Sequence, residues 1–369
     1  MSDQNFVDGV DLALVPKVSL HDHLDGALRA STIVDLAQQR GIELPESEPR
    51  ALQQWFESAS KSGSLPEYLE TFAVTISVMQ TAEELRRVAK EYVVDLSEDG
   101  VIYGEVRWAP EQHQREGLTL DEAVTAVQEG IDQGVNLVRS HGRRMQVNQI
   151  LSAMRQDDRA LEIADLALRF RYSGVVGFDI AGPEEGFPAA RLQDAFDLIA
   201  RAHFPATVHA GEGAGIESVQ DALFSGRARR LGHGTRVAED ISISSVDDDS
   251  TYVQLGEIAE WVKDRQIPLE ISPVSNVHTG TIAQWGDDIA DHPFDLLYQL
   301  GFAVTVNTDN RLMSGTSLTN ELGELADAFA YDLDDIETFQ LNAVAAAFLP
   351  VEEREDLADA ISDGFEDLR

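Results

Sequence analysis

The chain has 369 residues and carries 28 Lys and Arg against 66 Asp and Glu, a formal net charge of −38 at pH 7. It contains no cysteine, which excludes a disulfide framework, a thiolate zinc site, an iron–sulfur cluster and a cysteine nucleophile. The excess of carboxylates argues against nucleic acid and anionic membrane surfaces as partners.

The N-terminal segment 1–17 is acidic and lacks the basic start and apolar core of a secretion signal. No later stretch approaches the roughly 20 consecutive apolar residues of a membrane span. We therefore expect a soluble, cytoplasmic protein, whose oligomeric state the sequence does not specify.

Short apolar and β-branched runs alternate along the chain with longer stretches of helical periodicity. The expected strands are Val18–Leu24, Val101–Trp108, Met145–Leu151, Val175–Ile180, Ala206–Ala210, Arg230–His233, Pro268–Ile271 and Phe302–Asn307. The expected helices are Ala82–Leu96, Leu120–Gly142, Asp158–Arg171, Ala189–His203, Ser218–Ser225, Leu255–Asp264 and Phe294–Leu300. This alternation predicts an α/β fold with a parallel sheet, and a (β/α)₈ TIM barrel needs about 250 residues. An open doubly wound sheet is the alternative.

We expect a single domain, 1–369, with helical insertions near 32–98 and a C-terminal helical extension near 316–369. Residues 40–65 and the polar, acidic stretch Ser242–Ser250 are interpreted as surface insertions. The apolar segment Leu65–Met79 is equally compatible with a helix that covers a ligand and with core packing.

Metal-ligating residue types follow several of the predicted strands, where the reactive groups of a barrel collect. His21 and His23 lie two residues apart at the end of the first strand, so their side chains share one side of it. His209 ends the fifth strand and Asp309 follows the eighth. Three imidazoles with one carboxylate predict a single divalent metal ion, and they suit zinc best. The alternative is a set of hydrogen-bonded core residues.

Glu212 follows His209 by three residues, and His233 lies between two glycines at the end of the sixth strand. A metal lowers the pKa of water, and a neighbouring acid can protonate a ring nitrogen during hydrolytic attack on a ring carbon. We therefore interpret Glu212 as the acid and His233 as the base. Stabilisation of a helix N-terminus by Glu212 and a core role for His233 are the alternatives.

These motifs resemble those of the adenosine deaminase family. The similar segments, in the order of the family, are 16–26, 103–107, 177–182, 209–212, 231–234, 275–276 and 308–309. The resemblance implies a zinc-dependent barrel that converts adenosine and 2′-deoxyadenosine to inosine and 2′-deoxyinosine plus ammonia. It implies one zinc ion on His21, His23, His209 and Asp309. It also implies that Glu212 donates a proton to purine N1 and that His233 orients the attacking water and helps to deprotonate it.

The resemblance further implies four substrate contacts. Asp25 would bind the ribose, the backbone N–H of Gly182 would bind purine N3, Asn310 would bind N7, and His23 would lie against the substrate. The family usually has aspartate where this chain has Asn310, whose NH₂ is a permanent donor. We therefore expect activity with an altered pH dependence or purine selectivity.

Asp25 stands where relatives that act on adenine tend to have glutamate, which favours a nucleoside over adenine. The negative charge of Asp25 also disfavours AMP, because it would repel the phosphate group. Deamination of adenine or of a modified adenine nucleoside is the alternative activity, and a catalytically silent nucleoside-binding protein is the alternative from another class.

Overall fold

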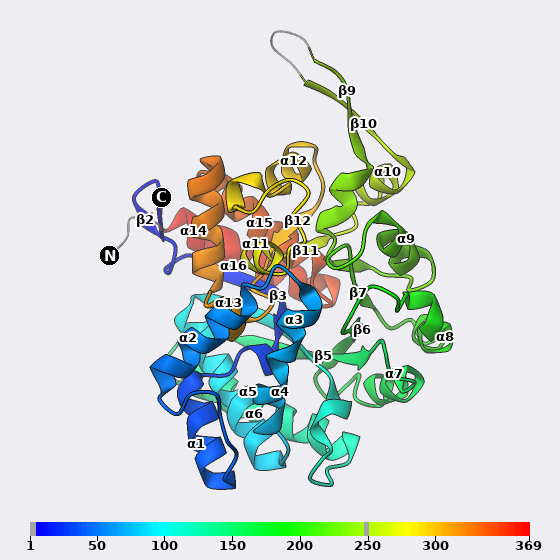
Figure 1. Cartoon of the computed structure of the whole chain (residues 1–369). Helices are drawn as coiled ribbons and strands as arrows, with labels where there is room; N and C mark the ends of the chain where they lie inside the picture. Colours follow the sequence, from blue (N-terminus) through cyan, green and yellow to red (C-terminus); the bar gives the residue numbers. More distant parts are fainter. Residues whose placement is uncertain (1–4, 247–250) are drawn as a thin grey trace.

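The computed structural model describes residues 5–246 and 251–369. Its centre is formed by two four-stranded parallel sheets (Figure 1). The first consists of β3 (Lys17–His23), β4 (Val101–Trp108), β5 (Gln146–Met154) and β6 (Val175–Ala181). The second consists of β7 (Thr207–Ala210), β8 (Arg230–His233), β11 (Leu269–Ile271) and β12 (Val304–Val306).

Two isolated parallel bridges join these sheets into a closed barrel. Phe178 in β6 pairs with Ala206 before β7, and Asp22 in β3 pairs with Asp309 after β12. At the second seam the backbone N–H of His23 donates to the carbonyl of Asp309 at 2.8 Å. The predicted TIM barrel is therefore confirmed, and the open sheet is excluded because the first and last strands meet.

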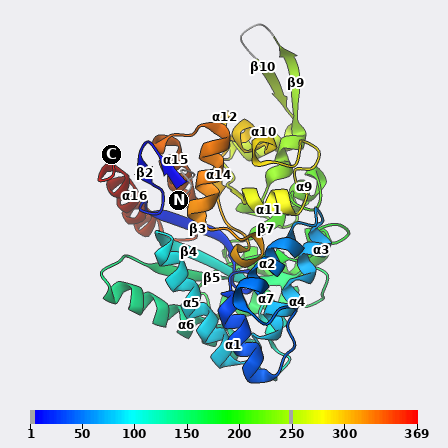
Figure 2. The same ribbon diagram turned by 60° about the vertical axis from the view of Figure 1, so that its left-hand side comes forward.

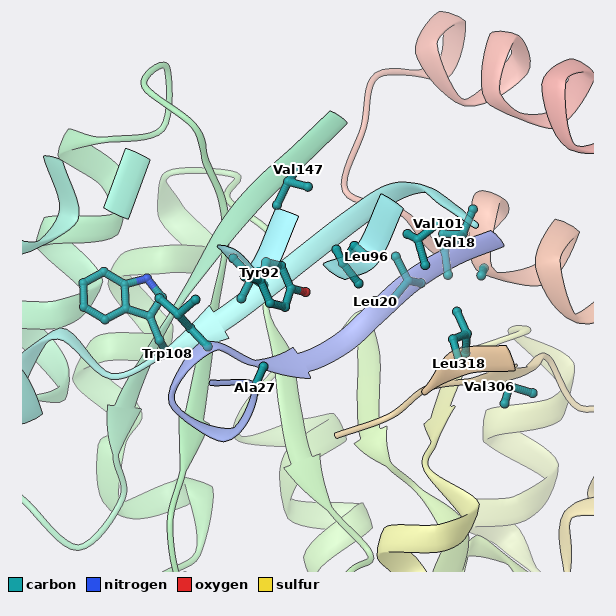
Figure 3. Packing of buried hydrophobic residues seen from close by; sticks show 14 of the residues in the cluster. Val18, Leu20, Ala27, Tyr92, Leu96, Val101, Trp108, Val147, Val306 and Leu318 are labelled. Atoms are coloured by element: carbon teal, nitrogen blue, oxygen red, sulfur yellow. The ribbon is translucent and has the colours of Figure 1, made fainter. Parts of the chain in front are cut away.

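Side chains between the strands and the surrounding helices form a continuous hydrophobic core. Val18 and Leu20 of β3, Val101 and Trp108 of β4, and Tyr92 of the adjacent helix are buried within it (Figure 3). Strands that are buried on both faces read as near-continuous apolar runs. This property explains why the strand positions could be predicted.

Each outer helix follows a strand and packs against its neighbours. The main ones are α5 (Ala82–Glu98), α6 (Leu120–Ser140), α7 (Ala160–Arg169), α8 (Gln193–Arg201), α9 (Ile216–Phe224), α10 (Glu257–Asp264), α12 (Phe294–Gln299) and α15 (Leu333–Ala346). The α5–α6 contact depends on glycine, because a Cβ at Gly134 would lie 2.7 Å from Cβ of Val93. Capping boxes at Thr81 and Thr119 fix where these two helices begin.

Additional helices lie before α5 and around the last strands (Figure 2). Before α5 the chain forms α1 (Ala30–Arg40), α2 (Pro49–Ser60), α3 (Leu65–Glu70) and α4 (Phe72–Ser77). Between β11 and β12 it forms α11 (Pro273–His278), and after β12 it forms α13 (Arg311–Ser314), α14 (Leu318–Phe329) and α16 (Val351–Glu366). The segment 40–65 therefore contains a regular helix, α2, with proline at its first position, where no N–H is needed.

The described part of the stretch Ser242–Ser250, residues 242–246, belongs to a β-strand of an antiparallel hairpin. β9 (Ile241–Val246) pairs with β10 (Thr251–Leu255), and the hairpin extends away from the barrel (Figure 1). Residues 247–250 lie outside the described residues. The strands were missed because they pack little apolar surface: Ile243 is 68% exposed.

The remaining elements are short. β1 (Phe6–Val7) pairs with β2 (Val10–Asp11), and 3₁₀ turns occupy Leu24–Gly26, Pro110–His113, Ala189–Leu192, Thr235–Asp240 and Ile289–Asp291. Across the described ranges, no helix has both the length and the apolar character that a membrane crossing requires.

Candidate active site

The carboxyl ends of the strands bring the predicted metal ligands together. His21 and His23 come from β3, His209 from β7, and Asp309 from the segment after β12. One nitrogen or oxygen of each residue lies within 4.8 Å of those of the other three. Asp309 has a left-handed backbone with φ of 57°, an uncommon conformation for a residue other than glycine. The bridge to Asp22 holds it there.

The candidate ligand atoms of these four residues lie close to one another. Nε2 of His23 lies 3.1 Å from Nε2 of His209. Oδ1 of Asp309 lies 3.4 Å from Nε2 of His21 and 3.3 Å from Nε2 of His23. Nε2 of His21 is buried and has no hydrogen-bond partner.

Two buried carboxylates determine which ring nitrogens carry protons. Nδ1 of His21 lies 3.0 Å from Oε2 of Glu270, and Nδ1 of His209 lies 2.9 Å from Oδ2 of Asp179. Carboxylates accept hydrogen bonds, so in the neutral rings both Nδ1 atoms donate and both Nε2 atoms expose lone pairs. Lone pairs that converge with a carboxylate fit a divalent cation, and carboxylate partners of this kind commonly orient metal-binding histidines.

Sequence reasoning assigned no role to Asp179 and did not single out Glu270. Glu270 accepts a hydrogen bond from Arg107 at 2.7 Å and forms an ion pair with Arg230, whose Nε lies 2.5 Å from Oε1 of Glu270. Burial favours the neutral acid, but the two guanidinium groups hold the pKa of Glu270 well below its ordinary value. The signal was available, because an apolar strand interrupted by a carboxylate implies a buried partner.

Glu212 and His233 lie next to the metal-ligand candidates. Oε2 of Glu212 is 3.5 Å from Nε2 of His233, and both side chains are buried. Burial raises the pKa of Glu212 well above its ordinary value, and the nearby charges of Asp309 and Glu184 raise it further. These surroundings favour the protonated form of Glu212.

A hydrogen-bond chain through Asn276 fixes the ring of His233. The amide oxygen of Asn276 accepts from the hydroxyl of Thr235 at 2.7 Å and lies 3.2 Å from Nε2 of His292. Nδ1 of His292 accepts the backbone N–H of Phe294, so its Nε2 is the donor. The amide nitrogen of Asn276 consequently donates to Nδ1 of His233, at 3.0 Å.

A neutral His233 therefore carries its proton on Nε2. Burial lowers the pKa of this imidazole well below its ordinary value, and the neighbouring His21 lowers it further. The ring thus presents an N–H donor, rather than a lone pair, on the side of Glu212.

A cavity of about 300 Å³ adjoins these groups. Its lining includes every predicted substrate-contacting residue, namely His23, Asp25, Gly182 and Asn310. It also includes residues of α3 and α4: Leu65, Tyr68, Leu69, Phe72, Ala73 and Ile76. The apolar segment Leu65–Met79 therefore forms one wall of the cavity, and Tyr68 also belongs to the core.

The polar lining residues are tightly confined. Gly182 has φ of 100°, and a Cβ there would lie 2.5 Å from the amide oxygen of Gln156, so only glycine fits. Burial raises the pKa of Asp25 to about 7. Oδ1 of Asp25 and Oδ1 of Asn310 are buried without a hydrogen-bond partner, which leaves both free to bind a ligand.

The sequence profile of a family described as "Adenosine deaminase" matches residues 16–364. This chain belongs to the adenosine deaminase family. It is 50% identical over 356 residues to "Adenosine deaminase 1" of Streptomyces coelicolor, covering 96% of this chain and 88% of that protein. It is 48% identical to the "Adenosine deaminase" of Mycobacteroides abscessus, with 96% of each chain covered. The family resemblance expected from the sequence is thereby confirmed.

Solved structures share this fold at lower sequence identity. The crystal structure of an adenine deaminase from Arthrobacter aurescens has a TM-score of 0.80 and 23% identity, covering 95% of this chain and 98% of that one. An amidohydrolase from Burkholderia ambifaria, solved with bound Zn, has a TM-score of 0.81 and 24% identity, covering 99% and 97%. Both likenesses support the barrel architecture of the adenosine deaminase family.

Proposed function

We propose that this chain is a zinc-dependent adenosine deaminase that hydrolyses adenosine and 2′-deoxyadenosine to the corresponding inosines and ammonia. The observation that carries this proposal is the convergence of three imidazole nitrogens and one carboxylate at a cavity of about 300 Å³, beside Glu212, whose pKa is raised by burial. Two relatives that share about half of their residues with this chain are named adenosine deaminases, which supports the same activity.

His21, His23, His209 and Asp309 are proposed to hold one zinc ion. The chain has no thiolate to offer, and imidazole with carboxylate suits zinc. When bound, zinc lowers the pKa of water to about 7 and so makes a nucleophile available at neutral pH. Glu270 and Asp179 keep His21 and His209 in the tautomers that ligation requires.

Glu212 is proposed to donate a proton to purine N1 as water adds at C6. Its raised pKa favours the protonated form, and the transfer neutralises the charge that would develop on the ring. The proton that the water loses then passes to the amino group, which leaves as ammonia, and the proton of the new C6 hydroxyl returns to Glu212 as the C6 carbonyl forms.

His233 is proposed to orient the attacking water through its Nε2–H. Its Nδ1 is already an acceptor for Asn276, so the neutral ring offers a donor toward the reacting groups. This leaves the carboxylate of Asp309, whose Oδ2 accepts the Ser275 hydroxyl at 2.6 Å, as the acceptor for the water proton. We therefore propose that His233 orients the water, and that it does not act as the base expected from the sequence.

Four lining residues are proposed to bind the nucleoside. Asp25 would accept from a ribose hydroxyl, the backbone N–H of Gly182 would donate to N3, and the amide of Asn310 would donate to N7. The ring of His23 also lines the cavity and would lie against the substrate. Adenine and modified adenine nucleosides are the competing substrates, and the free base would leave Asp25 without a partner.

A kinetic panel tests the proposal. Purified protein is assayed with adenosine, 2′-deoxyadenosine, adenine and AMP, by following ultraviolet absorbance, and zinc is measured in the same sample. We expect the highest kcat/KM for the nucleosides, activity that a chelator removes, and about one zinc per chain. Glu212→Gln should lower kcat by about a hundredfold or more while zinc is retained. Glu83→Gln, at an exposed position of α5, is the matched control. A higher kcat/KM for adenine or AMP, or activity that survives zinc loss, would contradict the proposal.

A further inference from the structure

A second cavity, of about 780 Å³, lies at the opposite end of the barrel from the catalytic residues. It is formed where the chain enters β6, β7, β8 and β11, and it is covered by the segment between α15 and α16. We call it the lower cavity; its lining residues fall within 171–176, 203–205, 229–230, 265–268 and 345–354.

The charge of the lower cavity is opposite to that of the protein. Its lining contains five arginines and no aspartate or glutamate, in a chain with a net charge of −38. The arginines are Arg171, Arg229, Arg230, Arg265 and Arg354. Salt screens interactions between charges that are more than about 8 Å apart at physiological ionic strength. The electrostatic potential at a ligand inside the cavity is therefore set by these arginines and not by the distant acidic surface.

Four of these arginines are not neutralised by the protein. Arg230 pairs with Glu105 and Glu270 at 2.6 and 2.5 Å. Within residues 5–246 and 251–369, the other four guanidinium groups form no ion pair. Arg227, only two residues before Arg229, does pair with a carboxylate, that of Asp197, at 2.6 Å. Four guanidinium groups without an ion pair are thus gathered at one cavity.

Neighbouring groups hold three of the free guanidinium groups without using up their donors. Arg171 donates to the carbonyl of Ala202 at 3.1 Å, and Arg354 donates to that of Ala345 at 2.8 Å. Arg265 stacks on Trp261, with 3.3 Å from its guanidinium carbon to the ring centroid. Each guanidinium has five N–H donors, so most stay available to a ligand.

We infer that the lower cavity binds a small phosphorylated molecule that carries at least two negative charges. The planar guanidinium fork matches phosphate oxygens, and four unpaired copies can compensate more than one charge. The cavity volume lies within the range of small-molecule sites. The lining residues Tyr172, Phe348 and Pro268 provide apolar surface for an organic portion of the ligand.

The probe for this site is uridine 5′-diphosphate, because its pyrimidine base differs from the purine proposed for the catalytic cavity. Binding to the full zinc-loaded chain is measured by calorimetry at low salt, with inosine present to occupy the catalytic cavity. Uridine and inorganic phosphate are titrated in parallel. We expect the diphosphate to bind and uridine not to bind, and the phosphate titration reports how much affinity the phosphate group alone supplies.

The double variant Arg229→Gln/Arg265→Gln removes two free charges and leaves Arg230, with its link to Glu270, unchanged. We expect its affinity for the diphosphate to fall by about tenfold or more, with adenosine deamination unchanged. Arg50→Gln/Arg144→Gln removes two exposed arginines elsewhere and is the charge-matched control.

Equal binding of uridine and its diphosphate, or equal affinity of the wild type and the cavity variant, would overturn the inference. The same holds if the diphosphate does not bind and the cavity variant instead changes the sedimentation of the protein. In that case the arginines contact the acidic surface of a second copy. Deamination is measured separately, so failure of this inference does not affect the proposed catalytic function.

Discussion

The buried carboxylate of Glu184 accepts a hydrogen bond from the backbone N–H of Glu212 at 3.0 Å. It also accepts the N–H groups of Gly211, Gly213 and Ala214, at 2.7, 2.7 and 3.1 Å. Four hydrogen bonds to one carboxylate fix the loop that carries the proposed proton donor. Glu184 is therefore a positioning residue that does not itself need to touch the substrate.

Replacing Glu184 by glutamine removes part of this acceptor capacity, since an amide has only one acceptor oxygen. We expect Glu184→Gln to lower kcat by about ten- to a hundredfold, because small misplacements of a catalytic group are costly. KM for adenosine and zinc content should change little. The neighbouring exposed residue gives the control, Glu185→Gln. A variant with normal kcat, or one whose kcat loss is matched by zinc loss, would argue against a positioning role.

Glu270 offers a test of the proposed metal site that does not depend on turnover. In Glu270→Gln the partner of His21 Nδ1 loses its charge, and we expect zinc affinity to fall by about ten- to a hundredfold. The measurement is competition with a chromophoric chelator. Glu105→Gln is the control, because Glu105 also pairs with Arg230 but contacts no proposed ligand. Equal zinc affinities of the two variants would remove the role of Glu270.

Asn310 distinguishes this chain from the usual pattern of its family. An aspartate in its place must be protonated to donate to purine N7, whereas the amide donates at any pH. We expect Asn310→Asp to lower kcat/KM for adenosine increasingly as pH rises, and to change the discrimination against 7-deazaadenosine. The measurement is kcat/KM for both nucleosides across pH. An unchanged pH profile together with unchanged discrimination would rule out the contact with N7.

The burial of Glu321 predicts that the stability of the protein depends on pH. Burial raises the pKa of this carboxyl to about 8, although its oxygen accepts the Val274 N–H at 3.1 Å. Between the ordinary pKa and about 8 the folded state binds more protons than the unfolded state. The free energy of unfolding therefore falls as pH rises, by at most about 1.4 kcal/mol per pH unit.

Urea unfolding at a pH of about 5.5 and again at about 7.5 measures this change in the free energy of unfolding. Glu321→Gln carries no titrating proton, so its stability relative to the wild type should increase over this interval. The control is Glu43→Gln, at an exposed position. A stability difference between Glu321→Gln and the wild type that does not vary with pH would show that Glu321 is not protonated in the folded state.

The strands could be predicted because each strand is buried on both faces and therefore appears in the sequence as an apolar run. The metal-ligand candidates could be located because His21, His23 and His209 stand at strand ends, and a barrel brings all such ends to one face. Asp309 was placed with them because it follows the eighth strand. The backbone bridge between Asp309 and Asp22 across the barrel seam could not be predicted from the sequence.

The missed features arise from contacts that are distant in sequence. Glu184 lies 27 positions from Gly211, the first N–H that it binds, and Glu270 lies 249 positions from His21. Neither carboxylate has a local pattern that names its partner. Helices were expected within residues 32–98, but the bounds of α2 were not predicted, because its buried apolar side, with Leu52 and Phe56, is interrupted by polar residues.

The β9–β10 hairpin leaves and re-enters the barrel at one point, because the N–H of Gly256 donates to the carbonyl of Asp240 at 2.6 Å. Asp240 and Gly256 are therefore already as close to each other as the two ends of a short turn. A short turn between Asp240 and Gly256 could therefore replace the arm while these two residues keep their positions.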